Sequence, residues 1–155
     1  MKSLQNIKVH FKKVSEKIGQ SISEPFYATS GSAGIDLAAC IEESIQIEPN
    51  KWAKIPTGLS VEIVTPNVAG FVFPRSGLAY RHGITLQNAV GVIDSDYRGP
   101  LEILLRNEGT DVIEINEGDR IAQIVFMPIF QVEINFTDEL NNTDRGNGGF
   151  GSTGV

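Results

Sequence analysis

The chain has 155 residues and a mass of 16.9 kDa, which suits one domain, and 41% hydrophobic residues can supply its core. Asp and Glu outnumber Lys and Arg by 19 to 13, and this net charge of −6 argues against a general nucleic-acid coat. No run approaches roughly 18 apolar residues, and the start has no apolar leader, so a membrane role is not expected. A single cysteine, Cys40, fits the reducing cytoplasm.

Short strands are predicted along most of the chain. Their segments are IKVHF, GIDLAAC, SIQI, KIPTGLSVEIV, AGFVF, ITLQNAVGVI, LEILL, DVIEI, RIAQIVF and VEINF, separated by clusters of Pro, Gly, Asn and Asp. Only SGLAYRH reads as a helix, with Ser76 as its expected cap and Gly83 just beyond its end. The predicted fold class is therefore all-β, a jelly-roll-like barrel or sandwich with one short helix.

The chain ends in a Gly-rich stretch, residues 138–155, which we call the C-terminal arm. Its Gly, Asn, Asp and Thr content cannot bury a core, so composition predicts a flexible arm after a β domain of residues 1–137. Gly146, Gly148 and Gly151 fit the G-x-G-x-x-G pattern of dinucleotide sites. That pattern needs a following helix, and four residues remain, so a Rossmann site is excluded.

The stretch GVIDSDYRG concentrates polar groups between two apolar runs. Its composition favours a hairpin turn. A calcium loop is the other interpretation, but it places Arg98 at the fifth position and Leu105 at the twelfth, where the ion needs oxygen ligands. A plain turn and a catalytic turn both remain open from this stretch alone.

Four other stretches set polar residues into an apolar frame: SAGIDLAA, PRSGLA, GDRIAQIVF and RGNGGFGSTG. Each has an ordinary structural explanation. Asp36 could cap a turn, Arg75 could pair with a surface carboxylate, and Gln123 could satisfy a buried backbone group.

Together, AGIDLAA, PRSGLA, HGI with Asn88 beyond it, GVIDSDYRG, GDRIAQ and RGNGGFGSTG resemble the five motifs of the trimeric dUTPases, from Ala33 to Gly154. The resemblance implies a jelly-roll homotrimer whose sites combine more than one subunit, with the C-terminal arm closing over nucleotide in a neighbouring site. It also implies Mg²⁺-assisted hydrolysis of dUTP to dUMP and pyrophosphate. That reaction limits uracil incorporation into DNA and supplies dUMP for thymidylate synthesis.

The resemblance assigns roles to individual residues. Asp94 would be catalytic, orienting a water for in-line attack on the α-phosphorus and accepting its proton. Asp36 and Gln123 would form the outer shell of Mg²⁺ through water, while the phosphates hold the ion directly. Asp96 is expected to fix the turn. The expected substrate-binding residues are Arg75, Ser76, Gly77, Asn88, Val92, Ile93, Asp94, Tyr97, Glu102, Gln123, Arg145, Phe150 and Gly151.

The chemistry of these side chains agrees with those roles. Arg75 and Arg145 can present guanidinium forks to phosphate oxygens. Backbone groups of the turn, with the Asn88 amide, can complement the imide edge of uracil. Tyr97 would lie against the deoxyribose, and Phe150 could stack on the base for roughly 1 to 3 kcal/mol.

Two alternatives remain. A dCTP deaminase or a bifunctional enzyme would share the fold and the PRS string, but IDSDYRG and GGFGSTG are of the hydrolase type. A non-catalytic dUTP-binding module is the second alternative, although all five motifs retain their polar residues.

Overall fold

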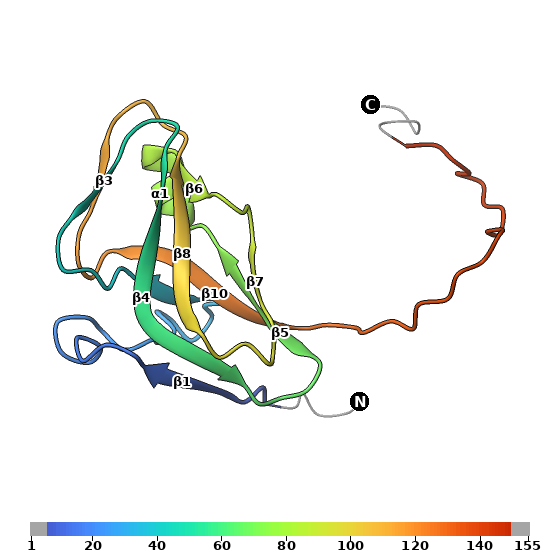
Figure 1. Ribbon diagram of the computed structural model, residues 1–155, viewed down its shortest axis with the longest axis horizontal. Coiled ribbons are helices and arrows are strands. Elements are labelled where there is room, and N and C mark those ends of the chain that lie inside the picture. Colours follow the sequence, from blue (N-terminus) through green and yellow to red (C-terminus); the bar gives the residue numbers. More distant parts are fainter. Residues whose placement is uncertain (1–5, 150–155) are drawn as a thin grey trace.

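The computed structural model describes residues 6–149, and these contain ten strands and one short helix (Figure 1). The helix, α1, spans Ser76–His82. The strands are β1 Val9–Lys13, β2 Ile35–Ala38, β3 Ile45–Ile47, β4 Trp52–Ile63, β5 Val68–Phe73, β6 Ile84–Leu86, β7 Gly91–Ile93, β8 Pro100–Asn107, β9 Ile113–Ile115 and β10 Arg120–Pro128. None of the described helical residues forms a stretch long and apolar enough to cross a membrane.

The strands form two four-stranded sheets and one two-stranded sheet, all paired antiparallel. One large sheet has the order β1-β4-β8-β6, the other β2-β10-β5-β7, and β3 pairs with β9. Alternate residues of both large sheets point into one core, which includes the fully buried Leu37, Ile55, Leu105 and Ile124. The all-β prediction is confirmed, as an open jelly-roll-like sandwich.

Helix α1 differs from the expectation at its start. Ser76 is the first helical residue, and the extended residue before it, Arg75, occupies the cap position. The predicted cap was therefore one residue too late. The end is as expected, because Gly83 adopts φ 67° and donates its N–H to the Ala79 carbonyl.

The stretch GVIDSDYRG is a turn, but it is not a hairpin. Within residues 6–149, β7 pairs with β5, whereas β8 pairs with β4 and β6. The turn at 94–99 therefore carries the chain from one large sheet to the other. As a result β7 is an edge strand of its sheet, and no described strand pairs with the other side of its backbone.

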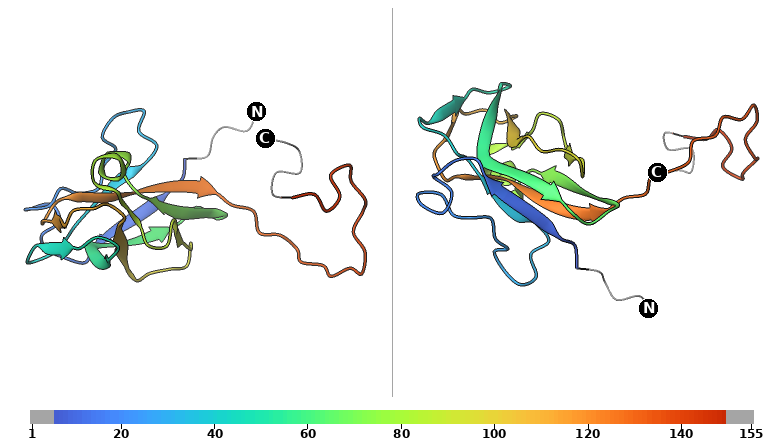
Figure 2. Two further views of the ribbon diagram at one scale, coloured as in Figure 1. Left: turned by 90° about the horizontal axis from the view of Figure 1, so that it is seen from above. Right: turned by 60° about the horizontal axis from the view of Figure 1, so that its bottom comes forward.

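The last predicted strand, VEINF, pairs with nothing in the described part of the chain. Beyond β10, Ile129 donates its N–H to the Asn67 carbonyl. Among the described residues, 130–149 make hydrogen bonds only with one another. Figures 1 and 2 show this part of the chain running away from the sheets. The strand expectation was wrong for the isolated chain, because an extended segment needs a partner strand to form a ladder.

Candidate functional site

The first group of predicted site residues lines an open cavity of about 290 Å³, which we call the Arg75 pocket. Strand β2 contributes Asp36, the junction of β5 and α1 contributes Arg75, Ser76 and Gly77, and β10 contributes Gln123. Asp36 and Gln123 lie directly opposite each other across the β2–β10 ladder. The fold therefore brings together residues from three parts of the sequence.

Arg75 is held in a fixed orientation at this pocket. Its Nε donates to Asp36 Oδ1 at 2.8 Å, its Nη2 to Asp36 Oδ2 at 3.5 Å, and its Nη1 to the Arg120 carbonyl at 3.3 Å. A guanidinium has five N–H donors. One N–H on each terminal nitrogen is thus left without a partner among the described residues, a fork suited to an anion.

Gln123 is oriented by its own hydrogen bond. Its Nε2 donates to the Pro74 carbonyl at 3.1 Å, and its Oε1 has no hydrogen-bond partner in the described part of the chain. The side chain lies against Gly34, where a Cβ would come within 2.6 Å of Oε1. Gly34 therefore makes room for an amide oxygen that can accept a hydrogen bond from water.

The second group lines two adjoining cavities of about 120 and 290 Å³, which we call the Asp94 pocket. Both are bounded by Val92, Ile93 and Glu102; Asn88 lines the smaller one, and Asp94 and Tyr97 line the larger one. Lys54, which also lines the larger cavity, pairs with Glu102 at 2.9 Å. The unpaired edge of β7 borders this pocket and supplies backbone N–H and C=O groups.

Arg98, and not Asp96, braces the turn. Arg98 Nη1 donates to the carbonyls of Ser95 at 2.8 Å and Tyr97 at 2.9 Å, while Asp96 makes no hydrogen bond within residues 6–149. The expectation for Asp96 was wrong because a guanidinium can reach several carbonyls of a turn at once. The Tyr97 hydroxyl is also fixed, donating to the Pro100 carbonyl at 3.0 Å.

The brace extends to the neighbouring sheet through Glu62 on β4. Arg98 Nη2 lies 3.4 Å from Glu62 Oε1, and His10 Nδ1 lies 3.0 Å from Glu62 Oε2. The hydrogen bond with His10, and then the attraction of Arg98, lower the pKa of the Glu62 carboxyl. Glu62 therefore stays charged at neutral pH and holds Arg98. The Asp94 carboxylate, by contrast, has no hydrogen-bond or ion-pair partner among the described residues.

The two pockets have no lining residue in common. Arg145 joins neither, and its Nε donates to the Gly148 carbonyl within the C-terminal arm. Phe150 and Gly151 lie outside the described residues. One chain therefore brings the other predicted residues together in two separate groups.

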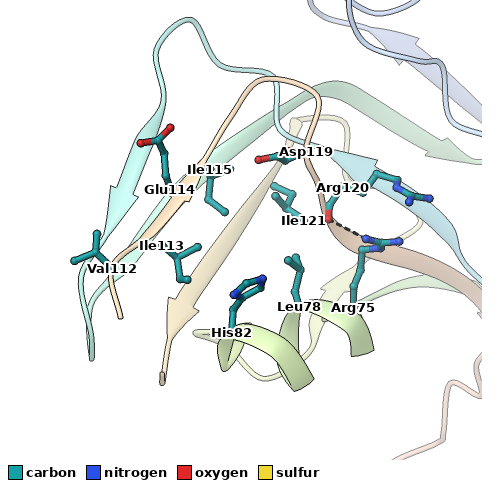
Figure 3. Close-up of a pocket in the computed structure, with 10 residues that line it drawn as sticks. All are labelled: Arg75, Leu78, His82, Val112, Ile113, Glu114, Ile115, Asp119, Arg120 and Ile121. Carbon is teal, nitrogen blue, oxygen red and sulfur yellow. Dashed lines mark hydrogen bonds between the residues drawn. The ribbon is translucent and has the colours of Figure 1, made fainter. Parts of the chain in front are cut away.

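A larger cavity, of about 470 Å³, lies beside the Arg75 pocket, between α1 and the β9–β10 connection (Figure 3). Leu78 and His82 line it from the helix, Ile113 and Ile115 from β9, and Arg75 and Arg120 from the side of the Arg75 pocket. Apart from Arg75, this cavity contains none of the predicted site residues. Arg120 lines both cavities and was not singled out from the sequence, although it stands inside the GDRIAQ string.

The donor groups at the Arg75 pocket fit an outer-shell role toward Mg²⁺. The described residues contain no group of three or more His, Cys, Asp or Glu side chains that could cage a metal. Asp36 and Gln123 offer oxygen atoms, which Mg²⁺ prefers, and Mg²⁺ usually keeps several water ligands.

Comparison with known proteins identifies close relatives. The sequence profile of the dUTPase family matches residues 20–154. The deoxyuridine 5'-triphosphate nucleotidohydrolase of Haemophilus influenzae (strain PittEE) is 50% identical over 147 residues, covering 95% of this chain and 97% of the relative. The enzyme of the same name from Escherichia coli O7:K1 is 46% identical over 147 residues, with the same coverage.

Solved structures agree in fold. A Staphylococcus bacteriophage 80alpha dUTPase with dUpNHpp superposes with a TM-score of 0.82 at 25% identity, covering 96% of this chain and 99% of that one. A mutant dUTPase from phage phi11 of S. aureus, in which a structural Mg(II) ion is coordinated, gives a TM-score of 0.75 at 24% identity, covering 87% of this chain and 99% of that one.

Proposed function

The chain belongs to the dUTPase family and hydrolyses dUTP, and from that premise we propose that water attacks the α-phosphorus under the direction of Asp94, giving dUMP and pyrophosphate. One observation carries the assignment to Asp94. Its carboxylate has no partner among residues 6–149, yet it stands on a turn braced by the three contacts of Arg98. A carboxylate that is free but positioned suits a general base.

The phosphates are assigned to the Arg75 pocket. The two remaining N–H groups of Arg75 can donate hydrogen bonds to phosphate oxygens. The first backbone amides of α1, at Ser76 and Gly77, have no carbonyl partner within the helix and can donate to phosphate as well. Mg²⁺, when bound, would neutralise phosphate charge, and Asp36 and Gln123 would hold its water ligands. Arg145 of the C-terminal arm would add a second fork.

The base and sugar are assigned to the Asp94 pocket. The unpaired edge of β7 can complement the imide edge of uracil as another strand would, and the Asn88 amide can both donate and accept. Such a site rejects bases with a different hydrogen-bond pattern, because its own polar groups would be left unpaired. Tyr97, whose hydroxyl is fixed, lines the same pocket and would lie against the deoxyribose. Phe150 would stack on the base.

A homotrimer would join the two groups of residues into complete sites. Residues 130–136 support assembly, because Phe130, Val132, Ile134 and Phe136 alternate with polar residues and are each at least 76% exposed. Such a segment matches one face of a strand and is expected to pair with another copy. The C-terminal arm that follows would then reach a neighbouring site. The single free thiol, Cys40, suits a cytoplasmic location.

The purified protein with Mg²⁺ should release pyrophosphate from dUTP at least about 10⁴-fold more efficiently than from dCTP, dTTP or UTP, measured as kcat/KM. Comparable rates on all four nucleotides would contradict the assignment of the β7 edge to uracil. Ammonia release from dCTP would favour the deaminase alternative. Tight binding of dUTP without turnover would favour the non-catalytic module.

Gly34→Ala should lower kcat/KM for dUTP by about 10- to 100-fold, since a misplacement of about 1 Å in a catalytic site has costs of this order. The added methyl would collide with Gln123 Oε1 and turn the amide away from the pocket. Steady-state kinetics at saturating Mg²⁺ would measure this. Gly31→Ala is the matched control, because a Cβ there meets nothing within 4 Å. Equal effects of both substitutions would remove Gly34 from the site.

A further inference from the structure

We propose that Arg120 is a positioning residue of the Arg75 pocket, which orients Asp36 and thereby aims the Arg75 guanidinium at the substrate phosphates. The inference rests on the proposed function of that pocket. It goes beyond that function because Arg120 acts through its neighbours and is not required to touch the nucleotide.

The backbone of β10 is irregular at the point that brings Arg120 to the pocket. Residues three apart on a regular strand face opposite sides of the sheet, so Arg120 and Gln123 should diverge. The β2–β10 ladder instead shifts register between Arg120 and Ala122, and both Ile121 and Ala122 are buried. This bulge places Arg120 and Gln123 in the same pocket. A regular strand would have kept one of them away.

Asp36 is shared between two guanidiniums. Its Oδ1 accepts from Arg75 Nε at 2.8 Å, and its Oδ2 accepts from Arg120 Nη1 at 3.0 Å. The Oδ2 contact with Arg75 is longer, at 3.5 Å. Arg120 therefore supplies the short bond that keeps the carboxylate plane in place while Oδ1 holds Arg75. The side chains of Asp36 and Arg75 are only 22% and 26% exposed, so water competes weakly for the bonds between them, whereas the Arg120 side chain is 53% exposed.

Arg120 also contacts Arg75 through its main chain. Figure 3 shows the Arg75 guanidinium beside the Arg120 carbonyl, which accepts from Nη1 at 3.3 Å. The same bulged residue thus fixes Arg75 twice, directly through its backbone and indirectly through its side chain and Asp36. Two cations around one carboxylate leave a net positive charge facing the pocket, which favours an anionic ligand.

The test is a double-mutant cycle on binding of dUpNHpp, measured by calorimetry with Mg²⁺. Arg120→Met should weaken binding about tenfold in the native background and less than about twofold in an Arg75→Ala background, because a residue acting through Arg75 loses its effect when Arg75 is gone. Equal losses in both backgrounds would overturn the proposal, since they would show a direct contact or a general structural role.

Conservative replacement adds a second readout. Arg120 uses a single nitrogen on Asp36, so Arg120→Lys should restore binding to within about threefold of the native protein. No rescue by Lys would contradict the role of this hydrogen bond.

The control for net charge is Lys17→Met. Lys17 resembles Arg120 in being a cation paired with carboxylates, here Glu42 and Glu117, but it lines none of the pockets described above. It should leave dUpNHpp binding unchanged, and a loss equal to that of Arg120→Met would overturn the proposal. The dUTP turnover of the native protein is measured first and tests the proposed function by itself. The Arg120 variants then test only the positioning role, so the two failures are distinguishable.

Discussion

Replacing Asp94 with Asn should lower kcat for dUTP by about 10² to 10⁴-fold, the usual contribution of a positioned general base. The amide has nearly the size and shape of the carboxylate and can still orient a water, but it cannot accept the proton that the attacking water loses. Because the phosphates are assigned to the other group of residues, dUpNHpp should bind within about threefold of its native affinity, a change of less than 1 kcal/mol.

Asp96→Asn is the matched control for this experiment. Asp96 stands two residues away on the same exposed turn and makes no hydrogen bond within the described residues. Its replacement changes the net charge identically and should alter kcat by less than about twofold, as surface substitutions usually do. If Asp94→Asn abolished dUpNHpp binding together with turnover, Asp94 would have a structural role and the general base would have to be sought elsewhere.

Deleting residues 145–155 should reduce kcat/KM for dUTP by about 5- to 150-fold, the equivalent of roughly 1 to 3 kcal/mol of lost stacking by Phe150 alone. Loss of the Arg145 guanidinium, which is assigned to the phosphates, would reduce kcat/KM further. The β sheets should remain folded, because in the described part of the chain the Arg145 side chain donates only to Gly148, which also belongs to the C-terminal arm. Thermal unfolding and solution mass would check that the deletion leaves the assembly intact. Full activity of the shortened protein would show that the C-terminal arm has no part in catalysis.

Mixed assemblies test whether the C-terminal arm serves another subunit. Co-expressed Asp94→Asn chains and chains lacking residues 145–155 should recover a measurable part of native activity, because a site can combine Asp94 from one chain with an arm from the other. Chains carrying both changes, mixed with Asp94→Asn chains, should recover none. Absence of recovery in the first mixture, when mass measurement shows that mixed assemblies have formed, would place the arm on its own subunit's site.

Local patterns in the sequence were sufficient to predict most strands and the helix. Alternation of apolar and polar residues in KIPTGLSVEIV predicts a half-buried strand, and β4 spans Trp52–Ile63 with that alternation. Gly83 predicts the end of α1 because a left-handed residue is easiest for glycine. These features depend on neighbours within a few positions, which any single sequence displays. The turn in GVIDSDYRG was also predicted from its own composition.

Other features depend on partners far away along the chain. Asp36 and Arg120 are 84 residues apart, and Arg98 and Glu62 are 36 apart, so neither pairing can be read from spacing. The bulge at Arg120 is equally hidden, since RIAQIVF predicts a regular strand. For this reason the sequence did not indicate a role for Arg98, and the role of fixing the turn was assigned to Asp96 instead.

The sequence by itself determined the fold class and the family, because alternation and motif strings are properties of short stretches. It also predicted which side chains would carry the chemistry, with Asp94 first among them. Only the tertiary structure decided how those side chains are held: Arg75 between Asp36 and Arg120, the turn by Arg98, and most of the predicted site residues in two separate pockets. The physical reason is that hydrogen bonds and cavities are set by distances in space, which sequence separation does not encode.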